Sequence, residues 1–207
     1  TASASALVRD LPEGRPAALA RRMLASACRM GSMIEDLLDV TRIRQHGGLV
    51  LRPVPLKLDA VCARALAELG EAQAGRVDLV AQGDLHGEWD AERLGQVLSN
   101  LLGNALRHGS ADQAVRLVLD GARPDCVRLE VRNGGCIPPE LLPVLFQPFR
   151  GREAHAGRQG GLGLGLFIVQ SIVHSHHGSV EVHSADGHTV FAVTLPRHAA
   201  ATPAAVA

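Results

Sequence analysis

The spacing of apolar residues predicts a long helix near the start of the chain. Over residues 16–45, apolar side chains recur at alternating intervals of four and three residues, a heptad pattern typical of helices that pack against other helices. The seam consists of Met23, Ala27, Met30, Ile34, Leu37 and Thr41, widened by Leu24 and Leu38. The first 15 residues are interrupted by proline and glycine and are too short to cover this seam. We therefore expect the helix to dimerise or to pack against a helix outside the chain.

After Gly47-Gly48, strand-like and helix-like patterns are mixed. We expect strands at 49–52, 114–119 and 126–132, hairpins at 76–89 and at 179–184 with 188–195, and helices at 56–74, 90–108 and 163–177. This mixture predicts an α+β fold, a two-layer α/β sandwich in which helices cover one face of a mixed, largely antiparallel sheet. We divide the chain into a helical region (1–48), a main domain (49–196) and a disordered tail (197–207).

Composition argues against several classes of function. The 21 basic and 21 acidic residues give a formal net charge of zero, and aromatic residues make up only 2%, so we expect no nucleic-acid-binding surface. No secretory signal opens the chain, and no apolar run approaches the roughly 20 residues of a membrane span, so we expect a soluble, cytoplasmic piece without membrane contact of its own. The four cysteines lie far apart without a C-x-x-C pair, which favours reduced thiols.

The predicted helix at 90–108 carries the first candidate site. Asn100 and Asn104 are four residues apart and therefore lie on one face of the helix, beside its apolar positions. Two readings stay open: both amides are satisfied within the core, or their oxygens help to hold Mg²⁺, which prefers oxygen ligands. Arg107 and His108, about one turn further on, would direct donor groups toward a phosphate.

Two glycine-rich stretches follow. The strand at 126–132 stops at Asn133-Gly134-Gly135, which suits a backbone edge that approaches a flat ligand or, equally, an ordinary turn. Further on, Gly160, Gly161, Gly163 and Gly165 precede an apolar helix whose first N–H groups would form an anion cradle. No lysine follows as in a P-loop, and the preceding "RGREAHAGRQG" is charged loop rather than the strand of a Rossmann motif.

These three segments, in this order, resemble the catalytic domain of sensor histidine kinases, the Bergerat ATP-binding fold that gyrase and Hsp90 also use. "NLLGNALRH" resembles the asparagine box, "LFQPFRG" the phenylalanine box, and "GGLGLGLFIVQSIVHSHHGSVEVHS" the second glycine box with the elements after it. "MIEDLLDVTRI" with "GGLVLRPVPLKLDAV" resembles the second dimerisation helix and its junction with the ATP-binding domain. The resemblance extends from about residue 16 to 196 and assigns 1–48 to the dimerisation region and 49–196 to the ATP-binding domain.

The resemblance implies a set of ligand contacts. Asn100 and Asn104 would hold Mg²⁺ and the phosphates of ATP, and Asn133 would read the adenine amino group. The remaining implied ATP contacts are Arg107, His108, Gly134, Gly135, Ile137, Arg158, Gly161, Leu162, Gly163, Leu164 and Gly165. The first glycine box reads "NGGCI", with Asn133 where the family has Asp and with one residue fewer. Because the amide oxygen of asparagine still accepts a hydrogen bond, we expect ATP binding to survive.

The implied activity is transfer of the γ-phosphoryl group of ATP to a histidine, and then to an aspartate in the receiver domain of a response regulator. The implied assembly is a homodimer of a bacterial protein, whose full-length form would be attached to a membrane in some cases. No histidine precedes His46, so the acceptor would lie outside this chain. Two alternatives stay open: a non-catalytic pseudokinase or phosphotransfer adaptor, and a serine kinase of the anti-sigma type, against which the long first helix speaks.

Overall fold

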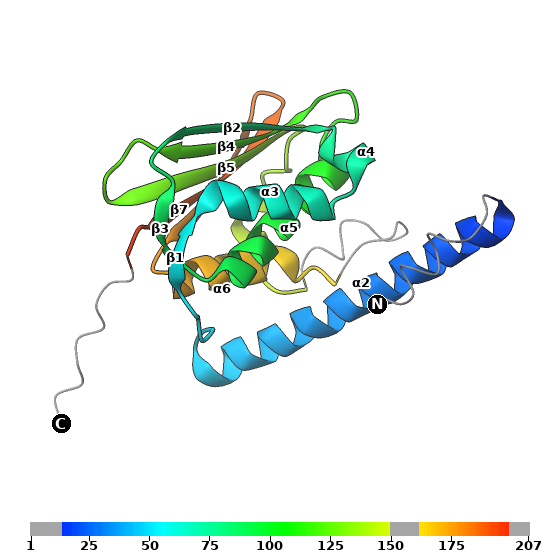
Figure 1. Ribbon diagram of the computed structural model, residues 1–207, viewed down its shortest axis with the longest axis horizontal. Coiled ribbons are helices and arrows are strands. Elements are labelled where there is room, and N and C mark those ends of the chain that lie inside the picture. Colours follow the sequence, from blue (N-terminus) through cyan, green and yellow to red (C-terminus); the bar gives the residue numbers. More distant parts are fainter. Residues whose placement is uncertain (1–13, 150–161, 199–207) are drawn as a thin grey trace.

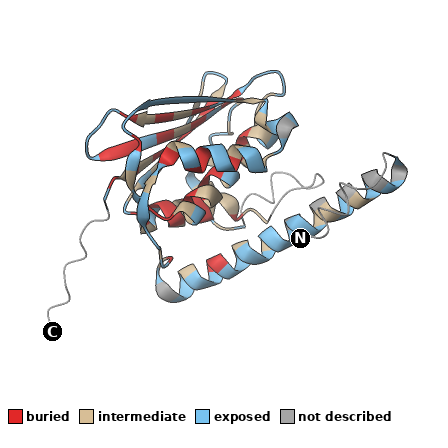
Figure 2. Cartoon of the chain, viewed as in Figure 1, coloured by how far each residue is buried: buried red, intermediate tan, exposed pale blue. Residues whose placement is uncertain are grey.

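A computed structural model describes residues 14–149 and 162–198, and Figure 1 shows them as coloured ribbon. The first element is the helix α2 (Arg15–His46), which confirms the helix expected at 16–45. It ends at Gly47, whose left-handed φ of 72° lets its N–H donate to the Ile43 carbonyl at 2.9 Å. In Figure 1 α2 runs past the rest of the molecule, and Figure 2 shows it mostly exposed.

A five-stranded sheet forms one layer of the domain. Its strand order is β2-β4-β5-β7-β6. The strands are β2 (Val77–Gly83), β4 (Val115–Gly121), β5 (Cys126–Gly134), β6 (Ser179–Ala185) and β7 (His188–Pro196). β2 pairs with β4 in parallel, while the other neighbours are antiparallel. The mixed sheet confirms the predicted α+β class. β1 (Val54–Lys57) and β3 (His86–Trp89) form a separate antiparallel pair.

Helices form the second layer on one face of the sheet, as Figure 1 shows. They are α3 (Leu58–Glu68), the short α4 (Glu71–Ala74), α5 (Ala91–His108) and α6 (Gly165–Ser175), with a 3₁₀ turn, η1, at Leu142–Val144. Alternate residues of the central strands point toward these helices, so that Leu117, Leu129 and Val193 are almost completely buried. Figure 2 shows the buried residues concentrated between the two layers. The aliphatic core thus lies directly beneath α5 and α6.

Three sequence expectations about the first half of the domain are wrong. The hairpin expected at 76–89 does not form, because β2 pairs with β4 and β3 pairs with β1. Between them, the Asp84 carboxylate accepts the His86 backbone N–H at 3.0 Å and Leu85 enters the core, which turns the chain away from β2. The strand expected at 49–52 forms instead at β1, and the helix expected at 56–74 is interrupted at Gly70, where φ is 81°.

The end of the domain also differs from expectation. The tail was expected to be disordered from residue 197 onward, but Arg197 is only 6% exposed. Its guanidinium donates to the backbone carbonyls of Asp84, His86, Gly121 and Arg123 at 2.6–3.3 Å. Arg197 therefore holds together two loops at one end of the sheet. Of the expected tail, residues 199–207 lie outside the described residues. Among residues 14–149 and 162–198, no helix has the length and apolar character needed to cross a bilayer.

Candidate nucleotide-binding site

Helix α5 is fixed at its start by the side chain that its sequence predicts. The Asp90 carboxylate accepts the backbone N–H groups of Glu92 and Arg93, both at 3.1 Å, and so caps the helix. One face of α5 is buried in the core, and it consists of Leu94, Val97, Leu98, Leu101, Leu102 and Ala105. Asn100 and Asn104 lie at the margin of this face and are only partly buried. The helix therefore presents both amides to a neighbour or a ligand rather than to the core.

The neighbour of Asn100 is the first residue of α6. A Cβ atom added at Gly165 would lie 2.6 Å from Asn100 Oδ1, closer than a carbon and an oxygen can approach. A side chain at this position would therefore force Asn100 to rotate away or α6 to shift. Asn100 and Gly165, far apart in the sequence, are thus neighbours in the fold.

Within the described residues, no side chain caps the start of α6. Its N-cap residue, Leu164, is buried at 1% exposure and supplies no capping side chain. Just before it, Gly163 adopts a φ of 72°, and its carbonyl accepts the N–H of Phe149 at 3.1 Å. The first N–H groups of a helix carry partial positive charge and have no partner within the helix. An anion bound at this positive helix end would therefore lie beside the Asn100 side chain.

Asn133 lies at the other end of the candidate site, where β5 stops. It is 7% exposed, and its Nδ2 donates to the Gly134 carbonyl at 2.8 Å. In this orientation, which is assigned from the hydrogen bond, Oδ1 remains to accept a hydrogen bond from a ligand. Gly109, at the C-terminal end of α5, would place a Cβ 3.0 Å from the Asn133 Cβ, so this end of α5 and the end of β5 lie together.

Sequence reasoning missed a pair of hydroxyl residues beside Asn133. Thr189 on β7 lies directly opposite Asn133, and Ser184 on β6 lies opposite Thr189. The two hydroxyls are 2.9 Å apart; Thr189 also donates to the Gly135 carbonyl at 2.9 Å, and Ser184 accepts the Ile137 N–H at 2.7 Å. These bonds hold the glycine turn after β5 in place. A threonine amid the apolar alternation of β7 was the available signal, but its partner could be known only from the register.

The positions of the other predicted site residues say less about nucleotide binding. Arg107 and His108 are exposed in the last turn of α5, near the Asn133 end rather than near the start of α6. A Cβ added at Gly134 would overlap the Gln113 side chain, and one at Gly135 would lie 3.6 Å from the His108 carbonyl. Leu162 packs against the core beside Leu164. Arg158 and Gly161 lie outside the described residues.

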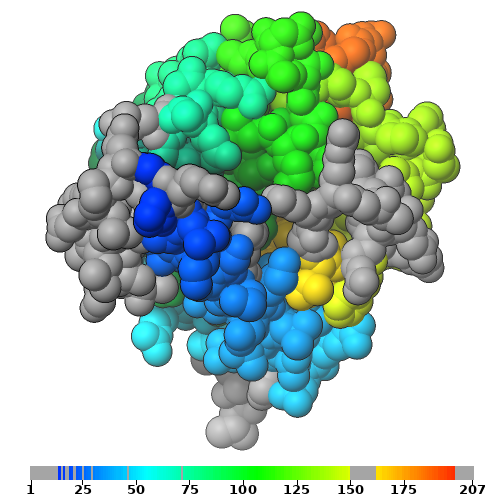
Figure 3. Space-filling view, turned by 90° about the vertical axis from the view of Figure 1, so that its right-hand side faces the viewer, coloured from blue at the N-terminus to red at the C-terminus, as the bar shows by residue number. Residues whose placement is uncertain are grey.

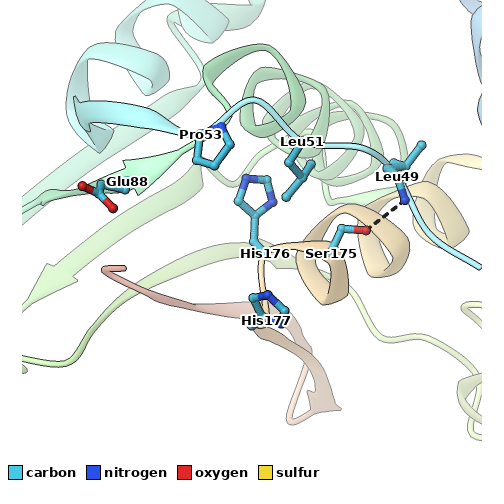
Figure 4. A pocket seen from close by; sticks show the side chains of 7 residues that line it. All are labelled: Leu49, Leu51, Pro53, Glu88, Ser175, His176 and His177. Carbon is cyan, nitrogen blue, oxygen red and sulfur yellow. Dashed lines mark hydrogen bonds between the residues drawn. The ribbon is translucent and has the colours of Figure 1, made fainter. Parts of the chain in front are cut away.

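A distinct hollow of about 190 Å³ lies at the opposite end of α6 (Figure 4). Its lining is Leu49, Leu51, Pro53, Glu88, Ser175, His176 and His177. His176 is buried: its Nε2 accepts the Asp90 N–H at 3.0 Å, and its Nδ1–H donates to the Ile172 carbonyl at 2.9 Å. Burial lowers the pKa of this imidazole, in line with the neutral form that these bonds require. The hollow marks the junction of α2 with the domain, away from Asn100.

The comparison with known families agrees with this geometry. Residues 89–199 match the family described as "Histidine kinase-, DNA gyrase B-, and HSP90-like ATPase". The chain belongs to this family. The match includes α5, the end of β5 and α6, and so every described residue of the candidate nucleotide site. The chain therefore contains an ATP-binding catalytic domain of the kind found in two-component sensor histidine kinases.

Individual relatives support the same assignment. The chain is 35% identical over 192 residues to the sensor histidine kinase TrcS of Mycobacterium tuberculosis, covering 90% of this chain and 38% of TrcS. It has the fold of the Acinetobacter baumannii histidine kinase AdeS, with a TM-score of 0.68 at 20% identity over 93% of this chain and 90% of that one. It also has the fold of full-length ShkA in complex with AMPPNP, with a TM-score of 0.68 at 21% identity over 95% of this chain and 42% of ShkA.

The chain spans between 28% and 49% of the length of the curated relatives that it matches over most of its own length. The catalytic ATP-binding domain is therefore common to this chain and those proteins, while much of each relative has no counterpart here.

Proposed function

We propose that this chain binds Mg·ATP between α5 and α6 and uses it to phosphorylate a histidine, from which the phosphoryl group passes to a response-regulator aspartate. The observation that carries the proposal is the contact between Gly165 and Asn100, which joins an oxygen ligand to an uncapped helix N-terminus. Triphosphate oxygens would accept from the first N–H groups of α6. The adenine would lie at Asn133, whose free Oδ1 accepts from an exocyclic amine.

The dimensions suit a nucleotide. Along α5, Asn100 marks the phosphate end and His108 the end beside β5, and eight residues of helix rise by about 12 Å. About 12 Å therefore separates the base-binding end, beside Asn133, from the phosphate-binding end, beside Asn100. An extended nucleotide places its base and its phosphates apart in the same way. The two ends are chemically different, so they also fix the direction in which the nucleotide lies.

The residues present fit a magnesium ion bound together with a triphosphate. Asn100 and Asn104 supply neutral amide oxygens, and Mg²⁺ in nucleotide sites takes few protein ligands because phosphates and water complete its shell. When bound, the ion would neutralise charge on the transferred group. The described residues contain no group of three or more histidine, cysteine or acidic side chains that would hold a metal by itself. The protein's contribution is therefore to position the triphosphate and to donate hydrogen bonds.

The assembly we propose is a homodimer through α2. The apolar seam of this helix is exposed: Met23 is 66% exposed, Met30 59%, and Ile34 61%. Figure 3 shows α2, in blue, at the molecular surface. Large apolar side chains repeated along one helical face are stabilised when a second helix covers them. The acceptor histidine would belong to a helix of that assembly outside this chain. We place the site in the cytoplasm, where ATP is available.

Calorimetric titration of the chain with AMPPNP, a non-hydrolysable ATP analogue, tests the proposal. We expect binding that strengthens with Mg²⁺ and that falls about 10- to 100-fold in Asn100→Ala and Asn133→Ala, because each loses a polar contact to the ligand. Ser99→Ala is the matched control, since Ser99 is an exposed neighbour of Asn100 on α5. A folded protein that binds no nucleotide would refute the kinase proposal and favour the adaptor.

A further inference from the structure

A buried carboxylate joins α2 to the ATP-binding domain. Asp39 is 3% exposed, although it belongs to a helix that is otherwise largely exposed. Its Oδ2 accepts from Arg93 Nη1 at 2.6 Å and from Gln96 Nε2 at 3.0 Å, and Arg93 Nη1 also donates to Gln96 Oε1 at 2.9 Å. Arg42 of α2 itself also lies 3.9 Å from Asp39 Oδ1, but its side chain is largely exposed. The contacts of Asp39 with α5 are therefore those with Arg93 and Gln96.

The stripe of α2 that carries Asp39 faces the domain. Asp36, Asp39, Val40 and Ile43 follow the i, i+3, i+4, i+7 spacing of one helical face; Val40 is 5% exposed, and Ile43 packs against the core. Burial raises the pKa of the Asp36 carboxyl, which agrees with its place on this face. The interface with the domain is therefore short and lies near the C-terminal end of α2.

The apolar seam lies on the other side of the same helix. At 3.6 residues per turn, the exposed seam residues are centred about 140° around α2 from the Asp39 stripe. The exposed residues are Leu19, Met23, Met30, Ile34, Leu37 and Leu38. A helix that covers the seam is thus separated from α5 by the width of α2, about 10 Å. In this arrangement a histidine on such a helix would lie on the far side of α2 from Asn100.

The segment between α2 and the domain contains the point about which the domain can turn relative to α2. From Leu49 onward it is tied to the domain, because the Leu49 N–H donates to Ser175 Oγ at 3.2 Å and the Arg52 N–H to Asp90 Oδ2 at 2.9 Å. Gly47 has a φ of 72° and open space around it. Gly47 and Gly48 therefore form the natural pivot. Turning there separates Asp39 from Arg93 without breaking the bonds within the domain.

We propose that Asp39 is a positioning residue that latches the ATP-binding domain to the near side of α2, and that its contacts with Arg93 and Gln96 open when the domain turns toward a histidine on the seam side. The need for such a turn rests on the proposed kinase function. The latch itself is a property of the chain that exists with or without nucleotide. Because Arg93 and Gln96 belong to the first half of α5, opening leaves Asn100 in contact with α6.

Spin labels on the native cysteines can measure the latch. Cys28 on α2 and Cys136 on the domain are exposed, while Cys62 and Cys126 are buried. Burial raises the pKa of Cys62 to about 12, so this thiol stays unreactive at neutral pH. Cys126→Ser removes the remaining thiol. The labelled chain is mixed with an excess of unlabelled chain, so that a dimer contains one labelled chain and the two labels report a distance within that chain. This distance distribution, measured by pulsed electron paramagnetic resonance without nucleotide, reports whether α2 and the domain keep one arrangement.

We expect one narrow distance in the parent protein and a second population in Asp39→Asn and Arg93→Gln, with the docked-to-released ratio falling at least about tenfold. The double variant should release less than the sum of the two single variants, because both remove the ion pair between Asp39 and Arg93. Glu35→Gln and Arg44→Gln, at exposed positions of α2, are the controls and should keep the single distance. A single unchanged distance in both test variants, or additive release in the double variant, would overturn the latch. If the parent protein itself does not bind AMPPNP, the proposed function is refuted instead, whatever the distance measurement shows.

Discussion

Replacing Gly165 by alanine tests the geometry of the candidate site most directly. No left-handed φ is required at Gly165, so the backbone itself tolerates alanine. The added methyl group, however, would lie 2.6 Å from Asn100 Oδ1 and 3.2 Å from its Cγ. Asn100 must rotate away or α6 must shift. Either response removes the amide oxygen from the place where we expect a phosphate-bound Mg²⁺.

The stability and the affinity of this variant should change by different amounts. Alanine in place of glycine favours a helix by about 0.5–1 kcal/mol, whereas overpacking costs about 1–3 kcal/mol. The free energy of unfolding should therefore fall by no more than about 2.5 kcal/mol. Losing one polar contact to a charged ligand costs about 1.5–3 kcal/mol, so AMPPNP binding should weaken about 10- to 100-fold.

The assay pairs calorimetry with urea denaturation, and Gly95→Ala is the control. Gly95 lies on the same helix as Asn100, but a Cβ there would meet only the flexible end of Arg64 at 3.4 Å. This variant should be as stable as the parent or slightly more stable, with unchanged affinity. If Gly165→Ala binds AMPPNP as tightly as Gly95→Ala, then the contact between Asn100 and α6 does not define the phosphate end, and the reasoning fails.

Three further predictions concern stability and assembly. Arg197→Met should lower the free energy of unfolding by at least about 3 kcal/mol in urea titrations, because the buried carbonyls of two loops lose their donors; a change below about 0.5 kcal/mol, as expected for the exposed Arg44→Met, would contradict this. His176 has a lowered pKa when folded, so its contribution is complete above its ordinary pKa near 6.5 and declines as the pH falls below that value. The stability difference between the parent and His176→Gln should therefore shrink from pH 7.5 to pH 5, and a difference independent of pH would exclude this role. Ile34→Lys should abolish association seen by sedimentation velocity, and a parent chain that stays monomeric across concentration would refute dimerisation through the seam.

Local signals predicted the parts of this fold that depend on neighbouring residues. Asp90 before an amphipathic run identified the start of α5 correctly, since both the cap and the apolar face are encoded within a few turns. The strand pairing of β2 could not be predicted in this way. Its partner β4 follows only after β3 and α5, and the choice depends on which inner residues align across the sheet. Arg197 was missed because its carbonyl partners belong to two loops that only the folded sheet brings together.

The candidate site shows the same division between local and long-range information. The asparagine pair and the glycine stretch are visible in the sequence as separate features, and resemblance to a family joins them. Their contact depends on the packing of α5 against α6, which no spacing within either segment reveals. The role of Thr189 could not be predicted from the sequence, because it depends on the strand register that places this threonine opposite Asn133. The roles assigned to these residues remain predictions for the titrations described above.

The two ends of the proposed site differ in how far the fold forms them before a ligand binds. At the adenine end, the sheet fixes Asn133, and the bonded hydroxyls of Thr189 and Ser184 support the turn after it, so this end is formed before a ligand arrives. At the phosphate end, no described side chain caps α6. Gly163, two residues before α6, and Phe149, whose N–H donates to the Gly163 carbonyl, both adopt positive φ values. A bound triphosphate would supply the hydrogen-bond acceptors that a capping side chain supplies elsewhere. The nucleotide would then accept hydrogen bonds from the N–H groups in the first turn of α6 that have no partner within the helix. Its binding free energy would stabilise the same helix that binds it.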